Sequence, residues 1–299
     1  MIYTITFNPA IDYVIHADNI NFGAVNRAAR EEIYFGGKGI NVSIILAELG
    51  IPSKALGFTA GFTGEAIEKG ILEMGIETDF VHLDNGFSRI NVKIKTENET
   101  EVNGQGPDIP QKKLTELFQK LDAVNTGDTI VLAGSIPSSL PSDVYEKILL
   151  YLNSKKIRAV VDASKELLVN ALKYKPFLIK PNNFELEEIF GVSISNFDEI
   201  IKYARKLKNM GAVNVLVSMA GEGAVLVDER NEIHTIGVCK GVVKNSVGAG
   251  DSMIAGFIAG CENNDYEYAL KLGTACGGAT AFSGSLAKRE DIFKLMKQL

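Results

Sequence analysis

Four short apolar runs indicate the fold class: IVLA at residues 130–133, AVV at 159–161, FLI at 177–179 and VNVLV at 213–217. Amphipathic helical segments separate these runs from residue 111 onward. The strands of a parallel sheet are covered by helices on both faces, so they are apolar throughout instead of alternating. The pattern therefore predicts an α/β fold with a doubly wound, mainly parallel sheet flanked by helices.

The N-terminal third adds a strand, a helix and two segments without helical periodicity. Residues 1–7 alternate apolar and polar and stop at Asn8-Pro9, which is typical of a strand that ends in a turn. Residues 40–49 are mostly apolar and follow a glycine cluster, which predicts a buried helix. Residues 11–35 and about 80–106 lack helical segments. They predict a small β flap beside the sheet, within a single domain of residues 1–299.

Composition excludes several classes of partner. The chain carries 31 Lys and Arg against 37 Asp and Glu, a net charge of −6, without a basic block, so nucleic acid and anionic membranes are not expected to bind it. Its apolar stretches are shorter than the roughly 20 residues of a membrane span. The N-terminus lacks a basic signal-peptide region, and the three cysteines are scattered. We therefore expect a reduced, cytoplasmic protein.

The strongest chemical motif is Asn245-Ser246-Val247-Gly248-Ala249-Gly250-Asp251-Ser252, which precedes an apolar, helix-compatible run. A loop of small residues that opens a helix presents free backbone N–H groups and the positive end of the helix dipole, which suits a phosphate or a developing anion. Asp251 is expected in the first helical turn, where it can accept the proton of an attacking hydroxyl. The alternative interpretation is an ordinary acidic helix cap.

A second glycine cluster, Gly36-Gly37-Lys38-Gly39, leads into the helix that contains Asn41. It is not a P-loop, because Lys38 is followed by glycine where a metal-binding Ser or Thr is needed. Lys38 at a helix start adds positive charge to a backbone anion site. Tight packing of helix against strand is the structural alternative.

Two further loops directly follow predicted strands. Residues 218–223 (SMAGEG) lie where ligands of open α/β sheets bind, although a plain β-turn has the same pattern. Residues 180–185 (KPNNFE) offer amide and carboxylate oxygens that suit hydrated magnesium, with a capped helix start as the alternative. A dinucleotide fingerprint is absent at the first strand end and at residues 248–253. The histidines at 16, 82 and 234 lack metal-ligand spacing, so we expect surface or filler roles for them.

Together these motifs resemble the two signatures of the PfkB, or ribokinase-like, carbohydrate kinases, in matching order along the whole chain. Asn8-Pro9-Ala10-Ile11-Asp12 and Gly134-Ser135 also occur where the family pattern has them. The resemblance implies a ribokinase-like α/β body with a small β lid, formed by about 11–35 and 80–106. It further implies MgATP-dependent phosphorylation of a sugar hydroxyl.

The resemblance also implies roles for individual residues. Asp251 resembles the catalytic base, and Gly248, Ala249 and Gly250 resemble the anion hole for the transferring phosphoryl group. The residues implied for ATP are Lys180, Asn182, Ser218, Gly221, Glu222, Gly223, Gly248 and Gly250. Asn182 and Glu185 resemble the pair that organises magnesium, through water. The residues implied for the sugar are Asp12, Gly37, Lys38, Asn41, Asn91, Ser135 and Asp251.

Asn8 to Asp12, with Val25-Asn26-Arg27, resembles the hexose-phosphate branch of the family, which requires a cationic phosphate pocket. Arg27, Lys38 and Arg89 are the cations expected there, although Arg27 also fits an exposed lid charge. The expected reaction is phosphorylation of fructose 1-phosphate at the 6-hydroxyl. Tagatose 6-phosphate or fructose 6-phosphate as acceptor, and a non-catalytic sugar-phosphate sensor, are the alternatives. By analogy, the lid is expected to form a homodimer.

Overall fold

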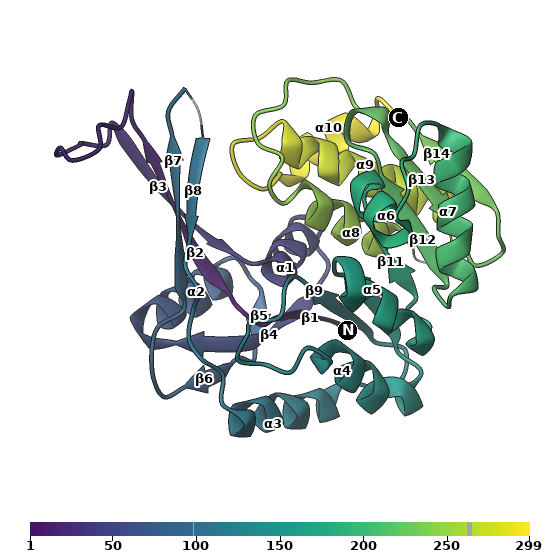
Figure 1. Ribbon diagram of the computed structural model, residues 1–299, viewed down its shortest axis with the longest axis horizontal. Coiled ribbons are helices and arrows are strands. Elements are labelled where there is room, and N and C mark those ends of the chain that lie inside the picture. Colours follow the sequence, from purple (N-terminus) through teal and green to yellow (C-terminus); the bar gives the residue numbers. More distant parts are fainter. Residues whose placement is uncertain (98, 262–264) are drawn as a thin grey trace.

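The computed structural model describes residues 1–97, 99–261 and 265–299, and its central element is a large sheet (Figure 1). Within these ranges the sheet has ten strands. Their spatial order is β14 (Ile233–Ile236), β13 (Ala224–Val227), β12 (Asn214–Ser218), β11 (Leu178–Ile179), β10 (Arg158–Asp162), β9 (Thr129–Ala133), β1 (Ile2–Thr6), β4 (Ser53–Ala60) and β5 (Glu77–Thr78), with β6 (Val81–Leu83) pairing separately with β4. All pairs from β5 to β12 are parallel, whereas β13 and β14 are antiparallel at one edge.

The four apolar runs of the sequence coincide with β9, β10, β11 and β12, which confirms the predicted mainly parallel sheet. Every residue of β9 and β11 is buried. Of β10 only Arg158 at the start is exposed, and of β12 only Ser218 at the end is partly accessible. Continuous burial follows from helices on both faces of the sheet.

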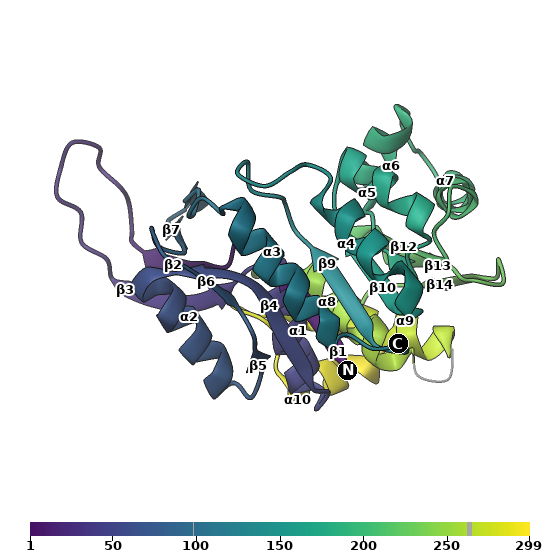
Figure 2. The same cartoon turned by 90° about the horizontal axis from the view of Figure 1, so that it is seen from below.

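The helices form two layers, and Figure 2 shows α4–α7 above strands β10–β14, α9 below these strands, and α10 low in the view near the N-terminus. One layer contains α3 (Gln111–Lys120), α4 (Val144–Leu152), α5 (Lys165–Ala171), α6 (Asn183–Phe190) and α7 (Phe197–Asn209). The other contains α1 (Lys38–Glu48), α8 (Ala249–Gly260), α9 (Tyr266–Ala281) and α10 (Arg289–Met296), while α2 (Gly61–Glu73) packs beside α1. Short 3₁₀ turns occupy Leu121–Ala123, Asn153–Lys155, Leu172–Tyr174 and Ala220–Glu222.

A separate small sheet stands beside the body, at the upper left of Figure 1. Its order is β3 (Arg30–Gly36), β2 (Ala10–His16), β7 (Arg89–Lys95) and β8 (Glu99–Asn103), with only β2 and β7 parallel. The two segments predicted to form a flap supply these strands. Residues 81–83 of the second segment differ: they form β6 in the large sheet, because Val81 and Leu83 are buried in its core. Asn98 of that segment lies outside the described residues.

Within the described ranges, each helix is too short or too polar to span a bilayer. The three cysteines, Cys239, Cys261 and Cys276, are buried and free of disulfides. The fold thus places the carboxyl ends of β1, β9, β10, β11 and β12 along one edge of the large sheet, facing the small sheet.

Candidate active site

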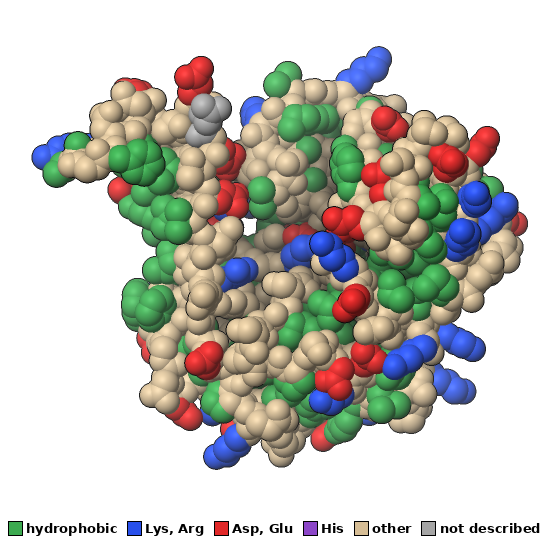
Figure 3. Space-filling model, viewed as in Figure 1, with side chains coloured by type: hydrophobic (Ala, Val, Ile, Leu, Met, Phe, Trp, Pro, Cys, Tyr) green, Lys and Arg blue, Asp and Glu red, His purple; other side chains and the backbone are tan. Residues whose placement is uncertain are grey.

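A cleft of 840 Å³ lies at this carboxyl edge, between the large sheet and the small one. Figure 3 shows the hollow between the two parts, with basic and acidic side chains gathered at its floor. Ligands of open α/β sheets bind outside the carboxyl ends of the strands, so the cleft is in the expected place. Its walls come from the small sheet, the ends of β10–β12, the starts of α1, α6 and α8, and one side of α9.

The start of α8 lies in the cleft. Gly248 is the N-cap with φ of 80°, and a Cβ there would lie 2.7 Å from Leu286 Cδ2. Only glycine meets both constraints without strain. The first turn of α8 contains Ala249, Gly250 and Asp251. The Ala249 N–H donates to Ser246 O at 3.2 Å, whereas the N–H groups of Gly250 and Asp251 precede the first intrahelical hydrogen bond and are available to an anion.

Asp251 is 5% exposed and lies at the floor of the cleft. Asn41 Nδ2 donates a hydrogen bond of 2.8 Å to Asp251 Oδ2, joining the two glycine motifs across 210 residues of sequence. Burial is the main cause that raises the pKa of Asp251 to about 6, and the charge of Asp162 adds to it. Lys38, Asn41 and Lys180 act in the opposite direction. Such a carboxylate is ionised near pH 7 yet basic enough to take a proton.

Two lysines and a buried carboxylate lie beside Asp251. Lys38 Nζ donates to Asp162 Oδ2 at 2.7 Å, and Lys180 Nζ lies 3.4 Å from Asp162 Oδ1. Burial alone would raise the pKa of Asp162, but Lys180 and Lys38 hold it below its usual value. The sequence analysis missed Asp162. The available signal was its position at the end of the AVV run, on the same edge as Lys180 and Ser218.

Of the residues predicted to bind ATP in the loop after β12, Ser218, Gly221 and Gly223 line the cleft, whereas the exposed Glu222 does not. Asn182 and Glu185 also line it, and they form a capping box at the start of α6. Asn182 Oδ1 accepts from Glu185 N, and Glu185 Oε2 accepts from Asn182 N, both at 2.8 Å. The capped helix start is therefore present, and the magnesium role of this pair stays a prediction.

The small sheet supplies a polar row to the opposite wall of the cleft. Asn91 Nδ2 donates to Asp12 Oδ1 at 2.8 Å across β7 and β2. Asn91 is 7% exposed, and its buried Oδ1 has no hydrogen-bond partner among the described residues. Arg89 lines the cleft and is held by a hydrogen bond of 3.2 Å from its Nε to Asn8 O. This wall therefore offers acceptors and a cation to a ligand.

The glycine cluster before α1 serves close packing as well as the cleft. Gly37 is the N-cap with φ of 120°, and a Cβ there would lie 2.5 Å from Thr6 Cγ2. A Cβ at Gly39 would lie 2.6 Å from Thr6 Oγ1. The packing interpretation is therefore confirmed for these glycines, while Gly37 and Lys38 also line the cleft.

Two predicted sugar-binding residues are not among those that line the cleft. Arg27 lies in the exposed 13-residue connection between β2 and β3, away from the cavity. Ser135 is exposed and follows β9 at the correct edge without reaching the cleft. Conversely, the sequence analysis missed an apolar end of the cleft, where side chains from α8, α9 and the segment before α8 converge: Val238, Cys239, Val243, Met253, Thr274 and Phe282.

Comparison with known proteins identifies this arrangement. Residues 5–290 match the model of the pfkB family carbohydrate kinases. The chain is 46% identical over 300 residues to 1-phosphofructokinase of Bacillus subtilis, covering 100% of this chain and 98% of that protein. It is 36% identical over 300 residues to D-tagatose-1-phosphate kinase of Bacillus licheniformis, covering 99% and 96%.

Among solved structures, this chain is similar to phosphofructokinase-2 from Escherichia coli in complex with substrates and products. The two structures have a TM-score of 0.92 and 27% sequence identity, covering 100% of this chain and 99% of that chain. The α/β body with its separate small sheet is accordingly the ribokinase-like fold. The family model spans nearly the full length and the fold agrees. This chain therefore belongs to the pfkB family of carbohydrate kinases, phosphotransferases with an alcohol group as acceptor.

Proposed function

We propose that this enzyme transfers the γ-phosphoryl group of ATP to the 6-hydroxyl of fructose 1-phosphate, giving fructose 1,6-bisphosphate and ADP. The observation that carries the proposal is the buried Asp251, set in the first turn of α8 at the floor of the cleft and hydrogen-bonded to Asn41. A base beside preorganised N–H donors is what phosphoryl transfer to a hydroxyl requires.

The reacting groups have distinct roles. Asp251 accepts the proton of the attacking 6-hydroxyl, and Asn41 holds the carboxylate through its hydrogen bond. In the predicted anion hole of Gly248, Ala249 and Gly250, the N–H groups of Gly248 and Gly250 stabilise charge on the transferring phosphoryl oxygens, because that of Ala249 already donates to Ser246 O. Little covalent chemistry is needed beyond this positioning.

Lysines and loop residues bind the triphosphate. Lys180 and Lys38 supply positive charge beside Asp251, and Ser218, Gly221 and Gly223 contact the nucleotide from their loop, while Glu222 of the same loop stays a predicted contributor outside the cleft lining. Glu185 lines the cleft, and its carboxylate oxygens suit the waters of a hydrated Mg²⁺, whereas the nearby Asp162 is already paired with Lys38 and Lys180. Asn182 and Glu185 would hold a hydrated Mg²⁺ through its waters, and the ion would neutralise charge on the phosphates.

The small sheet and the start of α1 bind the sugar phosphate. Asp12 accepts hydrogen bonds from sugar hydroxyls, and Asn91, Asn41 and Gly37 line the same part of the cleft. Arg89 binds the phosphate already present on the sugar, because a guanidinium matches phosphate oxygens in bidentate fashion. Arg27 and Ser135 stay as predicted contributors to this end.

The phosphate position follows from the relatives. Both named relatives act on 1-phosphates, which favours an acceptor with its phosphate on carbon 1 over the 6-phosphates. D-Tagatose 1-phosphate is therefore the second candidate acceptor, because the relative of that name is 36% identical over almost the whole chain. The two ketohexoses differ at one hydroxyl.

The small sheet is further proposed to act as a lid, within a single catalytic domain. Its face away from the cleft exposes apolar side chains, including Ile33 at 59% and Val102 at 60%, and a homodimer through this face would cover them. Light scattering of the purified enzyme tests this: Ile33→Asp should convert a dimer to a monomer, and a monomeric wild type would contradict it. A cytoplasmic location is part of the same proposal.

The experiment is MgATP-dependent turnover on fructose 1-phosphate, tagatose 1-phosphate, tagatose 6-phosphate, fructose 6-phosphate and fructose, compared by kcat/KM. The proposal expects the highest value for fructose 1-phosphate. Preference for a 6-phosphate would contradict the assigned phosphate position. Inactivity on all five, with sugar-phosphate binding retained, would support a non-catalytic sensor instead.

A further inference from the structure

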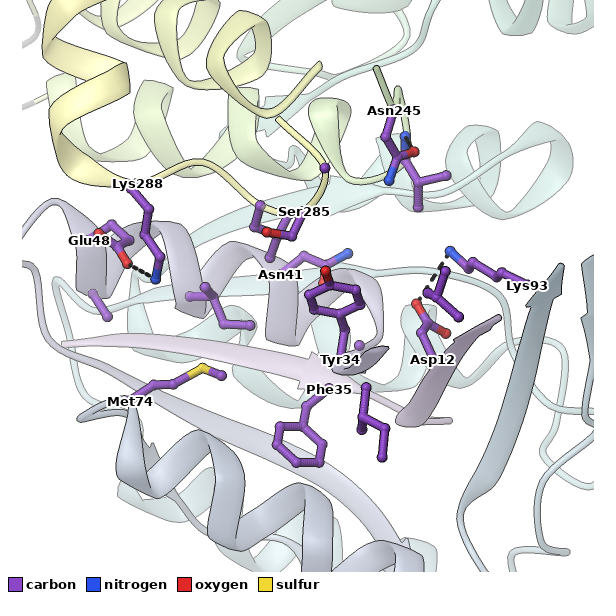
Figure 4. Close-up of a pocket in the computed structure, with 18 of the residues that line it drawn as sticks. Asp12, Tyr34, Phe35, Asn41, Glu48, Met74, Lys93, Asn245, Ser285 and Lys288 are labelled. Atoms are coloured by element: carbon purple, nitrogen blue, oxygen red, sulfur yellow. Dashed lines mark hydrogen bonds and ion pairs between the residues drawn. The ribbon is translucent and has the colours of Figure 1, made fainter. Parts of the chain in front are cut away.

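A second cavity adjoins the cleft beside the small sheet, and Figure 4 shows the residues that line it. Its volume is 660 Å³. Among the described residues, those that line both cavities are Asp12, Asn41, Lys93 and Val247. Asp12 and Asn41 already have roles in the proposed reaction. Lys93 is the charged residue of this shared wall to which neither the sequence nor the proposed function assigns a role.

Lys93 is unusual for a lysine because nearly all of its surface is buried. The residue is 7% exposed, whereas lysine ammonium groups normally reach water. Its Nζ lies 3.4 Å from Asp12 Oδ2 and 3.7 Å from Glu101 Oε1. These carboxylates come from β2 and β8, the strands on either side of β7. The ammonium therefore lies between two carboxylates on the cleft face of the small sheet.

The Asp12 carboxylate is constrained from three directions. Asn91 Nδ2 holds Oδ1 at 2.8 Å, and Lys93 Nζ lies beside Oδ2, as the dashed line in Figure 4 marks. On the third side Gly36 leaves just enough room for the carboxylate, since a Cβ there would come within 3.1 Å of Oδ2. Removing Lys93 would leave Oδ2 without its nearest cation and allow the carboxylate to turn.

We infer that Lys93 is a positioning residue for the sugar: it holds the Asp12 carboxylate in the orientation that accepts a hydroxyl of the sugar phosphate. This inference rests on the proposed function. Because Lys93 acts through Asp12, its removal should weaken binding of the sugar phosphate and leave the nucleotide and the chemical step nearly unchanged. A merely structural lysine would change both substrates or neither.

The test is Lys93→Met, which keeps the length of the side chain and removes the charge. The KM for fructose 1-phosphate should rise at least about tenfold, while the KM for ATP and kcat change by less than about threefold. Lys93→Gln retains N–H donors and should show a smaller rise. Lys95→Met is the matched control, because Lys95 lies two residues along the same strand and face and lines the second cavity but not the cleft.

A double-mutant cycle with Asp12→Asn separates positioning from structure. If Lys93 acts through Asp12, Lys93→Met should cost less than about threefold in sugar KM once Asp12 is already Asn. Full additivity of the two changes, or an unchanged sugar KM in both folded Lys93 variants, would overturn the inference. An inactive wild type would instead overturn the proposed function, so the two failures are distinguishable.

Discussion

Replacing Asp251 by Asn should stabilise the protein and nearly abolish its activity. The side chain is 5% exposed, and its pKa is raised from 3.8 to about 6, mainly by burial and secondly by Asp162. A carboxyl with a higher pKa in the folded than in the unfolded state is ionised at a cost to folding above that pKa. Asparagine removes the charge, and its amide oxygen can still accept the Asn41 hydrogen bond.

The size of the gain follows from linkage. A change from 3.8 to about 6 corresponds to about 3 kcal/mol of unfavourable charge burial at about pH 7.5. Because folding raises the pKa of this acid, the free-energy cost of its charge is complete above the folded-state pKa. The cost shrinks as pH falls and vanishes below the unfolded-state pKa. At about pH 4.5 the gain should be about 1 kcal/mol. For a chain of this length, 3 kcal/mol is a rise in Tm of roughly 5 °C.

The assay pairs thermal unfolding with turnover. The Tm of wild type and Asp251→Asn is measured at about pH 7.5 and 4.5, and kcat with fructose 1-phosphate is measured at about pH 7.5. Loss of a general base lowers kcat by about 10²- to 10⁴-fold. Asp18→Asn is the matched control, because Asp18 is an exposed carboxylate between β2 and β3, and neither quantity should change.

Two results would refute the reasoning. A lower Tm for Asp251→Asn at neutral pH would show that the ionised carboxylate stabilises the fold, against the burial argument. Turnover within about tenfold of wild type would show that Asp251 does not act as the base.

Three more predictions follow from the cleft. The kcat/KM of the wild type should fall about tenfold per pH unit below about pH 6, where Asp251 takes up a proton, and stay level above that pH. A pH profile of kcat/KM that is flat down to about pH 5 would contradict this. Arg89→Met should raise the KM for fructose 1-phosphate at least about tenfold and the KM for ATP little, and equal rises would exclude a phosphate role. Gly248→Ala should lower Tm and kcat, because the φ of 80° at Gly248 and the 2.7 Å approach of a Cβ to Leu286 disfavour a side chain. Gly284→Ala is the control, because a Cβ there meets nothing within 4 Å, and equal Tm values for the two variants would count against the prediction.

The body of the fold was predictable because its signal is local. Runs such as residues 130–133 are apolar throughout, and burial on both faces of a sheet requires that pattern. The glycine clusters before α1 and α8 predict helix starts equally locally, because each cluster is followed directly by a helix-compatible segment. Residues 81–83 were assigned to the flap, because three residues between turns do not reveal that they pair with β4 in the large sheet.

The site was predictable where strand ends alone determine it. Lys180 and Ser218 directly follow apolar runs and lie at the carboxyl edge as expected, and Asp251 occupies the first turn of α8. Lys93 was not predictable, because its role depends on the register of β7 against β2, which joins residues about 80 positions apart. The position of Arg27 was not predictable either. It lies in a long connection without buried side chains, so the sequence does not indicate where its charge lies.

The most direct test of phosphoryl transfer at Asp251 is ³¹P NMR of the purified enzyme with MgATP and fructose 1-phosphate. The account predicts one new sugar phosphomonoester, on carbon 6, formed in step with ADP, and negligible ADP without the sugar. ADP formation without a new sugar phosphomonoester, or transfer to any other hydroxyl, would contradict it.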